Sequence, residues 1–348
     1  MRTRLALLVL LIAVLVVPGV PARAAPPPGG ELTWSVAPAG PKGPNGRPSL
    51  TYKLDPGATI TDHVAVTNHS KRPLTLRLYA GDALTTTGGG FDLKADGRPP
   101  TDVGSWVRTG RRSVTVAPAT QLIIPITVTV PADATPGDHV GGIVASLAAG
   151  AADADGNQVT VEHRVGTRIY LRVTGPLRPQ LVVTEARTFV STSWNPLRLP
   201  VVTTEFTVRN TGNIRLTAQP SAEVHGLFGV GRRTSAAPGI PEILPGGSVQ
   251  TRTVTTGVLP LFRMWTTVDA RPGGADRQSI DAAPPPAVWS TAFWIFPWTY
   301  LALVVVLAGL IAGWVVGRRR RRRRDAEAMR EAERRGREQA RAELADAG

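Results

Sequence analysis

The sequence predicts an all-β fold, in which two tandem immunoglobulin-like β-sandwiches are followed by one C-terminal transmembrane helix. Hydrophobic and polar residues alternate over many short stretches, the period of two that is typical of half-buried strands. Glycine (36) and proline (31) are frequent between these stretches, as tight turns require. Towards the C-terminus a long uncharged apolar run is directly followed by seven arginines.

The first 24 residues have the pattern of a secretory signal peptide. Arg2 and Arg4 precede an apolar core at 5–17, and the sequence Ala-Arg-Ala at 22–24 offers a cleavage site. The core has about 13 residues, whereas a bilayer span needs about 20. We therefore expect cleavage, with an uncleaved N-terminal anchor as the alternative, and a short flexible lead at 25–31.

Residues 32–175 are expected to form the first immunoglobulin-like domain. The stretch "PLTLRLYA" places Leu74, Leu76 and Leu78 on one side of a strand and Thr and Arg on the other. Comparable alternation marks four further stretches, at 49–54, 60–68, 122–130 and 168–173. Strands at such spacing, separated by Gly, Pro, Asn and Asp, predict an antiparallel β-sandwich.

A domain boundary is expected at "GPLRP", residues 175–179, where glycine and proline interrupt the pattern. A second series of alternating stretches follows, and it predicts a second immunoglobulin-like domain over 176–281. The segment 282–293 opens with alanines and prolines, and we interpret it as a Pro-rich juxtamembrane stalk.

The two series contain an internal similarity. "AVTNHSKRPLTL" at 65–76 and "TVRNTGNIRLTA" at 207–218 share a strand, an asparagine turn and a second strand, so that Asn68 corresponds to Asn210. Further along each series, "VAPATQ" and "ILPGGS" supply a turn before a long strand. We infer that the two domains are related modules.

The run "WIFPWTYLALVVVLAGLIAGWVV" at 294–316 contains 23 residues and no charge. A helix of this length spans about 34 Å, enough to cross roughly 30 Å of hydrocarbon. Aromatic residues flank the run as they do at membrane interfaces: Trp289, Trp294, Trp298, Tyr300 and Trp314. A buried core helix is the alternative, and it does not account for these flanks, so we predict a membrane span.

Seven arginines follow this run: Arg318, Arg319, Arg320, Arg321, Arg322, Arg323 and Arg324. Basic residues beside a span stay on the cytoplasmic side and stop its transfer, and they attract anionic lipid headgroups. The block predicts a single-pass protein of the cell membrane with an extracellular ectodomain and a basic cytoplasmic tail at 317–348. The lipid bilayer is thus an expected partner.

The formal net charge of +14 also suggests a nucleic-acid-binding protein. Residues 318–348 carry 12 arginines and 7 acidic residues, and residues 1–24 carry three arginines, so these two ends account for +8. The remaining +6 is spread over the ectodomain, and we therefore expect no nucleic-acid partner. The Ala, Glu and Arg of the tail predict a solvated helix supported by i,i+4 ion pairs, with a docking role as the alternative.

Chemistry-bearing patterns are scarce. The absence of cysteine excludes disulfides, thiol nucleophiles and cysteine-ligated metals. His63 follows Asp62, and His139 follows Asp138. Because adjacent strand residues face opposite sides, neither pair is expected to act together. "DADGNQ", from Asp153, matches a calcium loop only in part and is interpreted as a hairpin turn. We expect a non-enzymatic protein with no catalytic residue, cofactor or metal site.

The first domain resembles a known family. The stretch "YKLDPGATITDHVAVTNHSKRPLTL" contains an aromatic strand, a "DPG" turn and a "VTNHS" turn, and "PADATPGDHVGGI" closes the region. Their order is similar to the peptidoglycan-binding domain of the WxL-interacting proteins, Gram-positive surface proteins known largely as a domain of unknown function. The resemblance covers residues 32–173 and implies peptidoglycan binding.

In that family a second immunoglobulin-like domain, a transmembrane helix and a basic tail follow in the order found here. The second domain of this chain matches only loosely, so the family's host-binding role is not carried over. The bias towards Arg, Ala, Gly and Pro, together with the lack of cysteine, suggests an actinobacterial source.

Aromatic side chains usually bind sugars by stacking on the rings, and three tryptophans are candidates: Trp34, Trp106 and Trp194. Trp106 precedes three arginines in "GSWVRTGRR": Arg108, Arg111 and Arg112. This combination suits a carboxylate-bearing peptidoglycan stem, so we predict these four residues as the glycan-binding or partner-binding site. The alternative is a core tryptophan beside a solvated basic hairpin.

Two functions follow from these observations. The first is a membrane-anchored surface protein that binds peptidoglycan, another cell-wall polymer or a cell-surface protein. The second is a scaffold or assembly subunit that pairs with another membrane or exported protein without binding glycan.

Overall fold

The computed structural model describes residues 32–152, 158–277 and 284–346. Strands make up 52% of the chain and helices 17%. The predicted signal peptide (1–24) and flexible lead (25–31) lie outside the described residues.

Two sheets pack face to face over residues 34–173, and we call this unit the first β-sandwich. One sheet has the strand order β2–β1–β4–β9–β7, and the other has the order β3–β11–β10–β5–β6, with β8 paired to β5. The bounds of these strands are β1 Trp34–Gly40, β2 Gly43–Pro44, β3 Leu50–Leu54, β4 Thr59–Asn68, β5 Leu74–Thr85, β6 Phe91–Leu93, β7 Val107–Arg108, β8 Ser113–Val116, β9 Gln121–Thr129, β10 Gly137–Ala152 and β11 Gln158–Val173.

The predicted alternation accounts for the core of this unit. Leu74, Leu76 and Leu78 of β5 are buried, whereas the residues between them are exposed. They pack against residues of the other sheet, such as Val64 and Ile126, in one continuous cluster. The alternation therefore identifies both the strands and the face of each that is buried.

One pairing differs from the antiparallel prediction. Strand β3 runs parallel to β11, with Leu50 opposite Ile169. The alternation of side chains along a strand has the same period in both orientations, so the sequence pattern carries no information about the direction of the neighbouring strand.

A second pair of sheets forms the second β-sandwich, over residues 181–295. One sheet has the order β12–β13–β17, and the other has the order β15–β14–β18–β19, with β16 paired to β14. The bounds are β12 Leu181–Ser191, β13 Val201–Asn210, β14 Leu216–Gly226, β15 Arg233–Ala236, β16 Ile240–Ile243, β17 Ser248–Thr255, β18 Phe262–Gly274 and β19 Ala287–Ile295. Its apolar residues form two clusters separate from that of the first β-sandwich.

The internal similarity of the sequence corresponds to a repeated buried contact. The Nδ2 group of Asn68 donates to the carbonyl of Arg72 at 2.8 Å and to that of Val116 at 3.0 Å. Its Oδ1 accepts from the backbone N–H of Ser70 at 2.8 Å. One fully buried side chain thus closes its own turn and ties it to the strand that ends at Val116.

Asn210 makes the same contacts in the second β-sandwich. Its Nδ2 group donates to the carbonyls of Ile214 at 2.7 Å and Ile243 at 2.9 Å. Its Oδ1 accepts from the backbone N–H of Gly212 at 3.0 Å. The turns that were matched in the sequence therefore occupy corresponding positions in the two sandwiches.

The prediction of a juxtamembrane stalk at 282–293 is wrong for the second half of that segment. Residues 287–293 belong to β19, which pairs along β18 from Ala287 opposite Ala270 to Ile295 opposite Phe262. Inward side chains such as Trp289 alternate with outward ones such as Val288. Because both sets are partly apolar, the alternation is weak, and the preceding prolines conceal it.

The predicted membrane span (294–316) begins too early. Trp294 and Ile295 end β19, and α3 runs without a break from Trp298 to Asp346. Pro297 separates the two elements. It has no backbone N–H to donate to a neighbouring strand, and its carbonyl accepts the N–H of Leu301 in the first turn of the helix at 2.9 Å. Within the described residues, α3 is long and apolar enough to cross a membrane.

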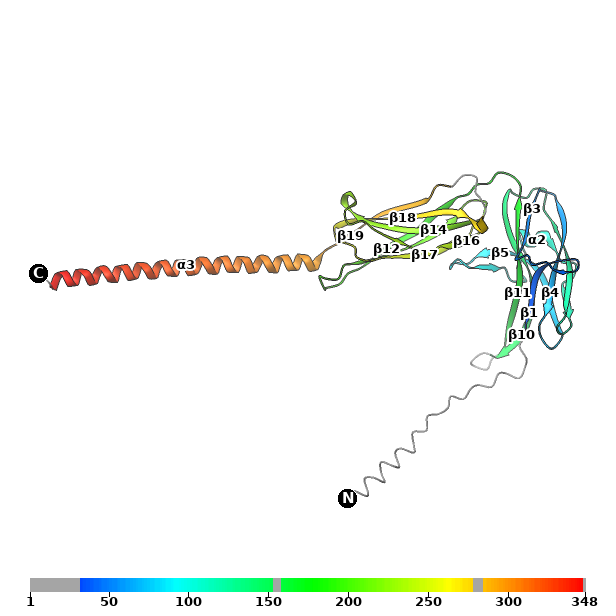
Figure 1. Cartoon of the computed structure of the whole chain (residues 1–348), viewed down its shortest axis with the longest axis horizontal. Coiled ribbons are helices and arrows are strands. Elements are labelled where there is room, and N and C mark those ends of the chain that lie inside the picture. The colour runs from blue at the N-terminus through cyan, green and yellow to red at the C-terminus, as the bar shows by residue number, and fades with distance from the viewer. Residues whose placement is uncertain (1–31, 153–157, 278–283, 347–348) are drawn as a thin grey trace, which may run out of the picture.

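The second β-sandwich lies between α3 and the first β-sandwich. Its strands continue the direction of the helix, and the first β-sandwich lies across its far end (Figure 1). The short helix α2 (Val103–Trp106) belongs to that distal unit. The chain thus separates the predicted ligand-binding residues from the apolar helix by the length of one sandwich.

Replacing either repeated asparagine should have a similar cost. Asn68→Ala or Asn210→Ala leaves at least two backbone carbonyls and one N–H without their side-chain partner, and each variant should lower the free energy of unfolding by roughly 2 kcal/mol. Urea unfolding of the full chain in detergent, followed by tryptophan fluorescence, measures this. The exposed Asn195→Ala serves as the control and should change stability by less than about 0.5 kcal/mol. Equal midpoints for all three variants would contradict the assignment.

Candidate functional site

The predicted ligand-binding residues lie at one edge of the first β-sandwich. Trp106 ends α2, Arg108 ends β7, and Arg111 and Arg112 follow in the turn before β8. The three arginines are exposed. The Trp106 ring is half buried against the core, and its centroid is 4.7 Å from that of His139. The arginines are therefore open to a ligand, whereas only part of the indole is.

The loop that carries Trp106 is fixed by a buried carboxylate. Asp82 of β5 accepts the backbone N–H groups of Thr101 at 2.7 Å, Asp102 at 3.1 Å and Gly104 at 2.9 Å. Lys94 contacts the same carboxylate at 3.1 Å. Burial alone would raise the pKa of Asp82, but these donors hold its pKa below the ordinary value. The carboxylate thus stays ionised and orders the start of α2.

The other two candidate tryptophans have different surroundings. Trp34 is buried, and its Nε1 donates to the carbonyl of Ala145 at 3.1 Å. It is a core residue and is not available to stack on a sugar. Trp194 is exposed, but it belongs to the second β-sandwich at the end next to α3. The structure does not bring the three tryptophans together.

The side chains of Asp62 and His63 have different surroundings. Asp62 binds Arg47, at 2.8 and 2.9 Å, and the hydroxyl of Tyr52, at 2.7 Å, rather than the ring of His63. Burial opposes ionisation of Asp62, but its hydrogen bonds with Arg47 and Tyr52 outweigh this, and its pKa is lowered. This cluster fastens β3 and the preceding loop to β4.

His139 has a partner that adjacent residues did not reveal. Its Nδ1 lies 2.6 Å from Oδ1 of Asp102, and its Nε2 lies 2.8 Å from the carbonyl of Thr135. Burial lowers the pKa of His139, but the hydrogen bonds with Asp102 and Thr135 outweigh it, and the pKa is raised overall. Asp102 is distant in the sequence, so only the folded chain forms this pair.

Metal binding gains no support from the described residues, in which no three potential ligands cluster. The turn predicted from Asp153 lies outside the described residues, and β10 and β11 pair on either side of it, from Ala152 opposite Gln158. The arginine block at 318–324 lies on α3 and is exposed, with Arg318 stacked 5.2 Å from the Trp314 ring.

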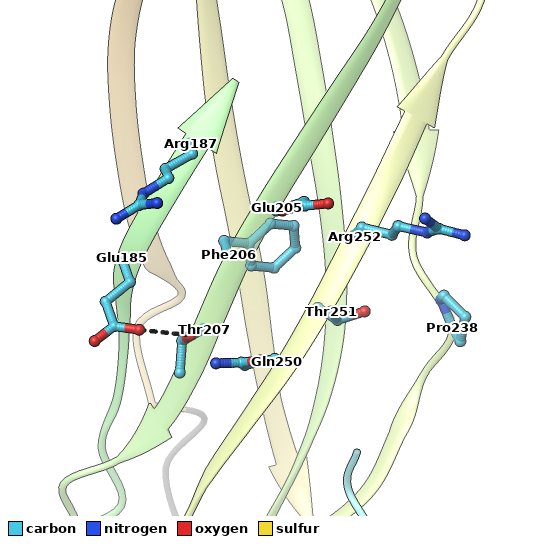
Figure 2. Close-up of a pocket in the computed structure, with 9 residues that line it drawn as sticks. All are labelled: Glu185, Arg187, Glu205, Phe206, Thr207, Pro238, Gln250, Thr251 and Arg252. Atoms are coloured by element: carbon cyan, nitrogen blue, oxygen red, sulfur yellow. Dashed lines mark hydrogen bonds between the residues drawn. The ribbon is translucent and has the colours of Figure 1, made fainter. Parts of the chain in front are cut away.

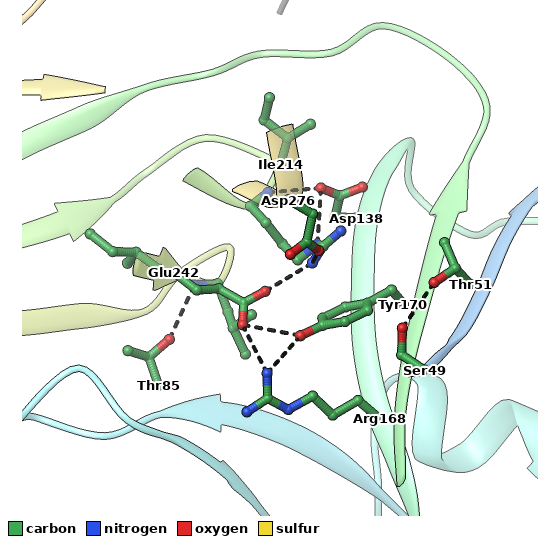
Figure 3. A network of polar contacts seen from close by, with 12 residues as sticks. Ser49, Thr51, Thr85, Asp138, Arg168, Tyr170, Ile214, Glu242 and Asp276 are labelled. Carbon is green, nitrogen blue, oxygen red and sulfur yellow. Dashed lines mark hydrogen bonds and ion pairs between the residues drawn. The ribbon is translucent and has the colours of Figure 1, made fainter. Parts of the chain in front are cut away.

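The junction between the two sandwiches contains a network of charged groups, shown in Figure 3. Arg215 of the second β-sandwich is its centre, because its side chain is only 2% exposed. The Nη1 group donates to Glu242 and to Asp276, each at 2.9 Å. Burial lowers the pKa of Arg215, but these two carboxylates outweigh it and raise the pKa. The guanidinium is thus charged and almost completely buried.

The first β-sandwich supplies the other half of this network. Asp138 binds Arg172 at 2.6 and 2.8 Å and accepts the backbone N–H of Arg215 at 2.8 Å. The Tyr170 ring lies 3.8 Å from the guanidinium of Arg215, and its hydroxyl donates to Glu242 at 3.2 Å. Burying charge is costly unless it is paired, and here the Arg215 cation is paired with Glu242 and Asp276 of its own sandwich and contacts Asp138 and Tyr170 of the other.

Asn213 fastens the backbone at the same junction. Its Nδ2 group donates to the carbonyls of Pro136 at 2.8 Å and Pro176 at 2.9 Å. Its own carbonyl accepts the N–H of Asp138 at 2.7 Å. Gly137 adopts φ +127°, and a Cβ there would lie 2.2 Å from that carbonyl, so only glycine permits this approach.

A hairpin of the first β-sandwich completes the junction. The Oγ1 of Thr85 accepts the N–H of Leu244 at 3.1 Å, and the carbonyl of Thr87 accepts the N–H of Gln250 at 2.8 Å. Leu244 also packs with Tyr170 and Val140 in a small apolar cluster. Charged, backbone and apolar contacts all cross the junction, so the two sandwiches are held in one orientation.

A shallow groove of about 580 Å³ lies on the three-stranded sheet (Figure 2). The register places Glu205 of β13 between Arg187 of β12 and Arg252 of β17. Beside this charged row, Glu185 adopts φ +52° at a bulge and accepts from Thr207 at 3.4 Å. The groove offers alternating charges to a polar partner, and its assembly from three strands hides it from sequence reasoning.

No family model matches the chain, and no curated protein matches it. A solved chain from a study titled "Chaperone-tip adhesin complex is vital for synergistic activation of CFA/I fimbriae biogenesis" is 10% identical, with a TM-score of 0.36 over 76% of this chain and 100% of that one.

Two further solved structures are similar at the same level. The class 5 fimbriae chaperone CfaA is 10% identical, with a TM-score of 0.35 over 74% of this chain and 99% of its own. The CupB2 chaperone of Pseudomonas aeruginosa is 10% identical, with a TM-score of 0.30 over 71% of this chain and 97% of its own. At TM-scores this low, the likenesses do not bear on what this chain binds.

Removal of Arg215 should loosen the junction. Arg215→Ala leaves Glu242 and Asp276 without their buried cation, and it should destabilise the chain by about 3–5 kcal/mol. The absence of cysteine allows spin labels at Thr61→Cys and Ser290→Cys, both exposed positions on opposite sandwiches. The distance distribution between the labels should broaden in Arg215→Ala but not in the control Arg271→Ala, which removes a largely exposed side chain. An unchanged distance distribution in Arg215→Ala would contradict the conclusion that this network holds the two sandwiches in one orientation.

The His139–Asp102 pair predicts a specific dependence on pH. Because the folded-state pKa of His139 is raised, its contribution to stability is fully present below the unfolded pKa of about 6.5 and is lost as pH rises through the folded pKa. His139→Gln should remove this dependence, and urea midpoints of both chains between acidic and mildly alkaline pH measure it. If the urea midpoint of His139→Gln changes with pH in parallel with that of the wild type, the assignment is wrong.

Proposed function

We propose that the protein is a non-enzymatic, single-pass membrane protein whose ectodomain consists of two tandem immunoglobulin-like domains, 32–175 and 176–281 with β19. The segment 1–24 directs export, α3 crosses the cell membrane, and the arginine block stays in the cytoplasm. The ectodomain then faces the cell wall or the surroundings of the cell. The first domain binds peptidoglycan, another cell-wall polymer or a surface protein.

One observation carries this proposal: the first β-sandwich lies at the end of the ectodomain farthest from α3 (Figure 1), and the contacts of the junction hold it there. A flexible tether would let the first domain fall back onto the membrane. The buried charges around Arg215 instead make the second domain a rigid spacer, which suits the display of a binding surface at a distance from the anchor.

The exposed edge formed by Arg108, Arg111 and Arg112 supplies the binding chemistry. Guanidinium groups bind carboxylates in bidentate geometry, and peptidoglycan stem peptides carry carboxylates. The resemblance of residues 32–173 to the peptidoglycan-binding domain of WxL-interacting proteins supports the same ligand class. The half-buried Trp106 is close to these arginines in the sequence and is proposed to add an aromatic contact.

The scaffold function is favoured by a different observation. The charged row of Arg187, Glu205 and Arg252 is exposed on the flat face of the three-stranded sheet. Alternating charges in fixed register suit a protein partner with complementary charges. In this second proposal the ectodomain pairs with a membrane or exported protein through the second domain and binds no glycan.

Co-sedimentation distinguishes the two proposals. The full chain in detergent is mixed with purified peptidoglycan, and Arg111→Ala/Arg112→Ala is compared with Arg271→Ala, which removes an exposed arginine elsewhere. Wall binding predicts retention of the wild type and the control and at least a several-fold loss in the double variant. Because the affected side chains are exposed, folding should not change.

Failure of the wild type to sediment would reject peptidoglycan as the ligand of the first domain. The scaffold proposal then predicts that a partner copurifies with the wild type and is lost on Arg187→Glu/Arg252→Glu. A partner retained by this charge-reversed variant would reject the scaffold proposal in turn.

A further inference from the structure

The end of the second β-sandwich next to α3 gathers three loops. They are residues 192–200, 227–232 and 256–261, which join consecutive strands of this sandwich. The register brings them to one end, because Val202 pairs with Thr255 and Gly226 with Met264. At the same end Phe262 pairs with Ile295, two residues before Pro297. All three loops therefore lie at the end of the second β-sandwich from which α3 begins (Figure 1).

Large apolar side chains are exposed at the tips of these loops. Trp194 is 85% exposed, Leu197 is 90% exposed and Phe228 is 94% exposed. Further exposed apolar residues of the same end are Leu227, Val230, Leu259, Phe262 and Phe296. We call these eight residues the apolar rim. A soluble surface rarely concentrates so many exposed apolar groups at one place.

Two rim residues also have unusual backbone conformations. Phe228 adopts φ +55°, and Phe262 adopts φ +64°. Bulky residues are rare in this region because Cβ is crowded there, and such conformations persist where a particular arrangement is needed. At 228 the left-handed backbone presents an aromatic ring to the exterior at a position where glycine or asparagine would be easier to accommodate.

The apolar rim is level with the first turn of the apolar helix. The hydroxyl of Tyr300 donates to the carbonyl of Pro196 at 2.7 Å, which fixes the loop 192–200 beside the third residue of α3. Trp194, Phe296 and Trp298 line one small cavity at this contact. The ring centroid of Phe296 is 5.9 Å from that of Trp294, on which it stacks, and 5.5 Å from that of Trp298.

The length of the uncharged helix places this level at a membrane surface. From Trp298 to Gly317 the helix carries no charged residue, and at 1.5 Å per residue this stretch measures about 30 Å. The hydrocarbon core of a bilayer is also about 30 Å thick. With Arg318 at one headgroup boundary, the first turn of α3 and the apolar rim beside it reach the opposite boundary.

Basic residues occur in and next to the loops of the apolar rim, and one of them, Arg232, also contacts Glu223 at 3.4 Å. Arg198, Arg232, Arg233 and Arg263 lie in or directly beside the loops, and the loops themselves contain no acidic residue. Apolar side chains surrounded by arginines match the interfacial zone of a bilayer, where apolar groups enter the acyl boundary and arginines reach phosphates.

From these observations we infer that the apolar rim inserts into the surface of the bilayer that α3 spans, so that the second β-sandwich stands directly on the membrane. This inference rests on the proposed membrane anchoring by α3. The occupant of the rim is the phospholipid bilayer, with anionic headgroups bound by the flanking arginines. The rim side chains lie at a depth of roughly 5–10 Å in the headgroup and acyl boundary.

Fluorescence quenching in nanodiscs tests this inference. The full chain, which has no cysteine of its own, carries one bimane label at Leu197→Cys, and each nanodisc of phosphatidylcholine and phosphatidylglycerol holds a single copy. The matched control is Arg209→Cys, an exposed position at the opposite end of the same sandwich. Lipids spin-labelled near the headgroup should quench the label at 197 several-fold more strongly than the label at 209.

A third label, at Leu307→Cys in the middle of the apolar helix, reports on anchoring alone. Quenching at 307 by lipids labelled deep in the acyl chain, with equal weak quenching at 197 and 209, would overturn the inference while anchoring holds. Loss of quenching at 307 would overturn anchoring and the inference together. A rim covered by a second copy or another protein leaves the label at 197 unquenched in these nanodiscs, which also overturns the inference.

Discussion

The arrangement of the whole ectodomain depends on one buried cation. The Arg215 guanidinium lies between carboxylates of its own sandwich and a ring and carboxylate of the other. Removing such a charge from water is unfavourable, and the surrounding carboxylates compensate for it. Any rotation of one sandwich against the other separates the cation from Asp138 and Tyr170. The orientation is therefore specified by electrostatics, and the apolar contact of Leu244 with Tyr170 adds to it.

Because the orientation of the two sandwiches is fixed, the surfaces at the two ends of the ectodomain have defined positions relative to each other. The exposed arginines at 108, 111 and 112 lie on the distal sandwich, and the apolar rim lies where the proximal sandwich meets α3. With a rigid junction, the position of the rim on the bilayer determines where the distal edge points. The charged row of the three-stranded sheet lies between these ends and is exposed on the side of the spacer. Three surfaces of different chemistry are thus arranged along one rigid body.

The sequence predicts the strands well where one face is apolar and the other polar, as in β5 and β13. It also identifies Asn68 and Asn210, because a buried asparagine in a turn leaves a local pattern. Strand β19 escapes prediction because Val288 and Trp294 make its outward face apolar as well. The junction cannot be predicted from the sequence, because Asp138, Arg215 and Glu242 are distant from one another along the chain and each resembles an ordinary surface charge. The apolar rim is likewise distributed over three separate loops, the start of β18 and the residue after β19, so no single stretch of the sequence indicates it.

The central claim is that the ectodomain stands as one rigid unit on the membrane. Energy transfer from a dye at Thr61→Cys of the distal sandwich to acceptor dyes in the bilayer surface, recorded on single nanodiscs, measures its height directly. Strands of the second β-sandwich run for about 11 to 13 residues, so they hold the distal sandwich roughly 40 Å above the surface. The account predicts one narrow height distribution that does not change with time. A broad distribution extending down to the bilayer would contradict it.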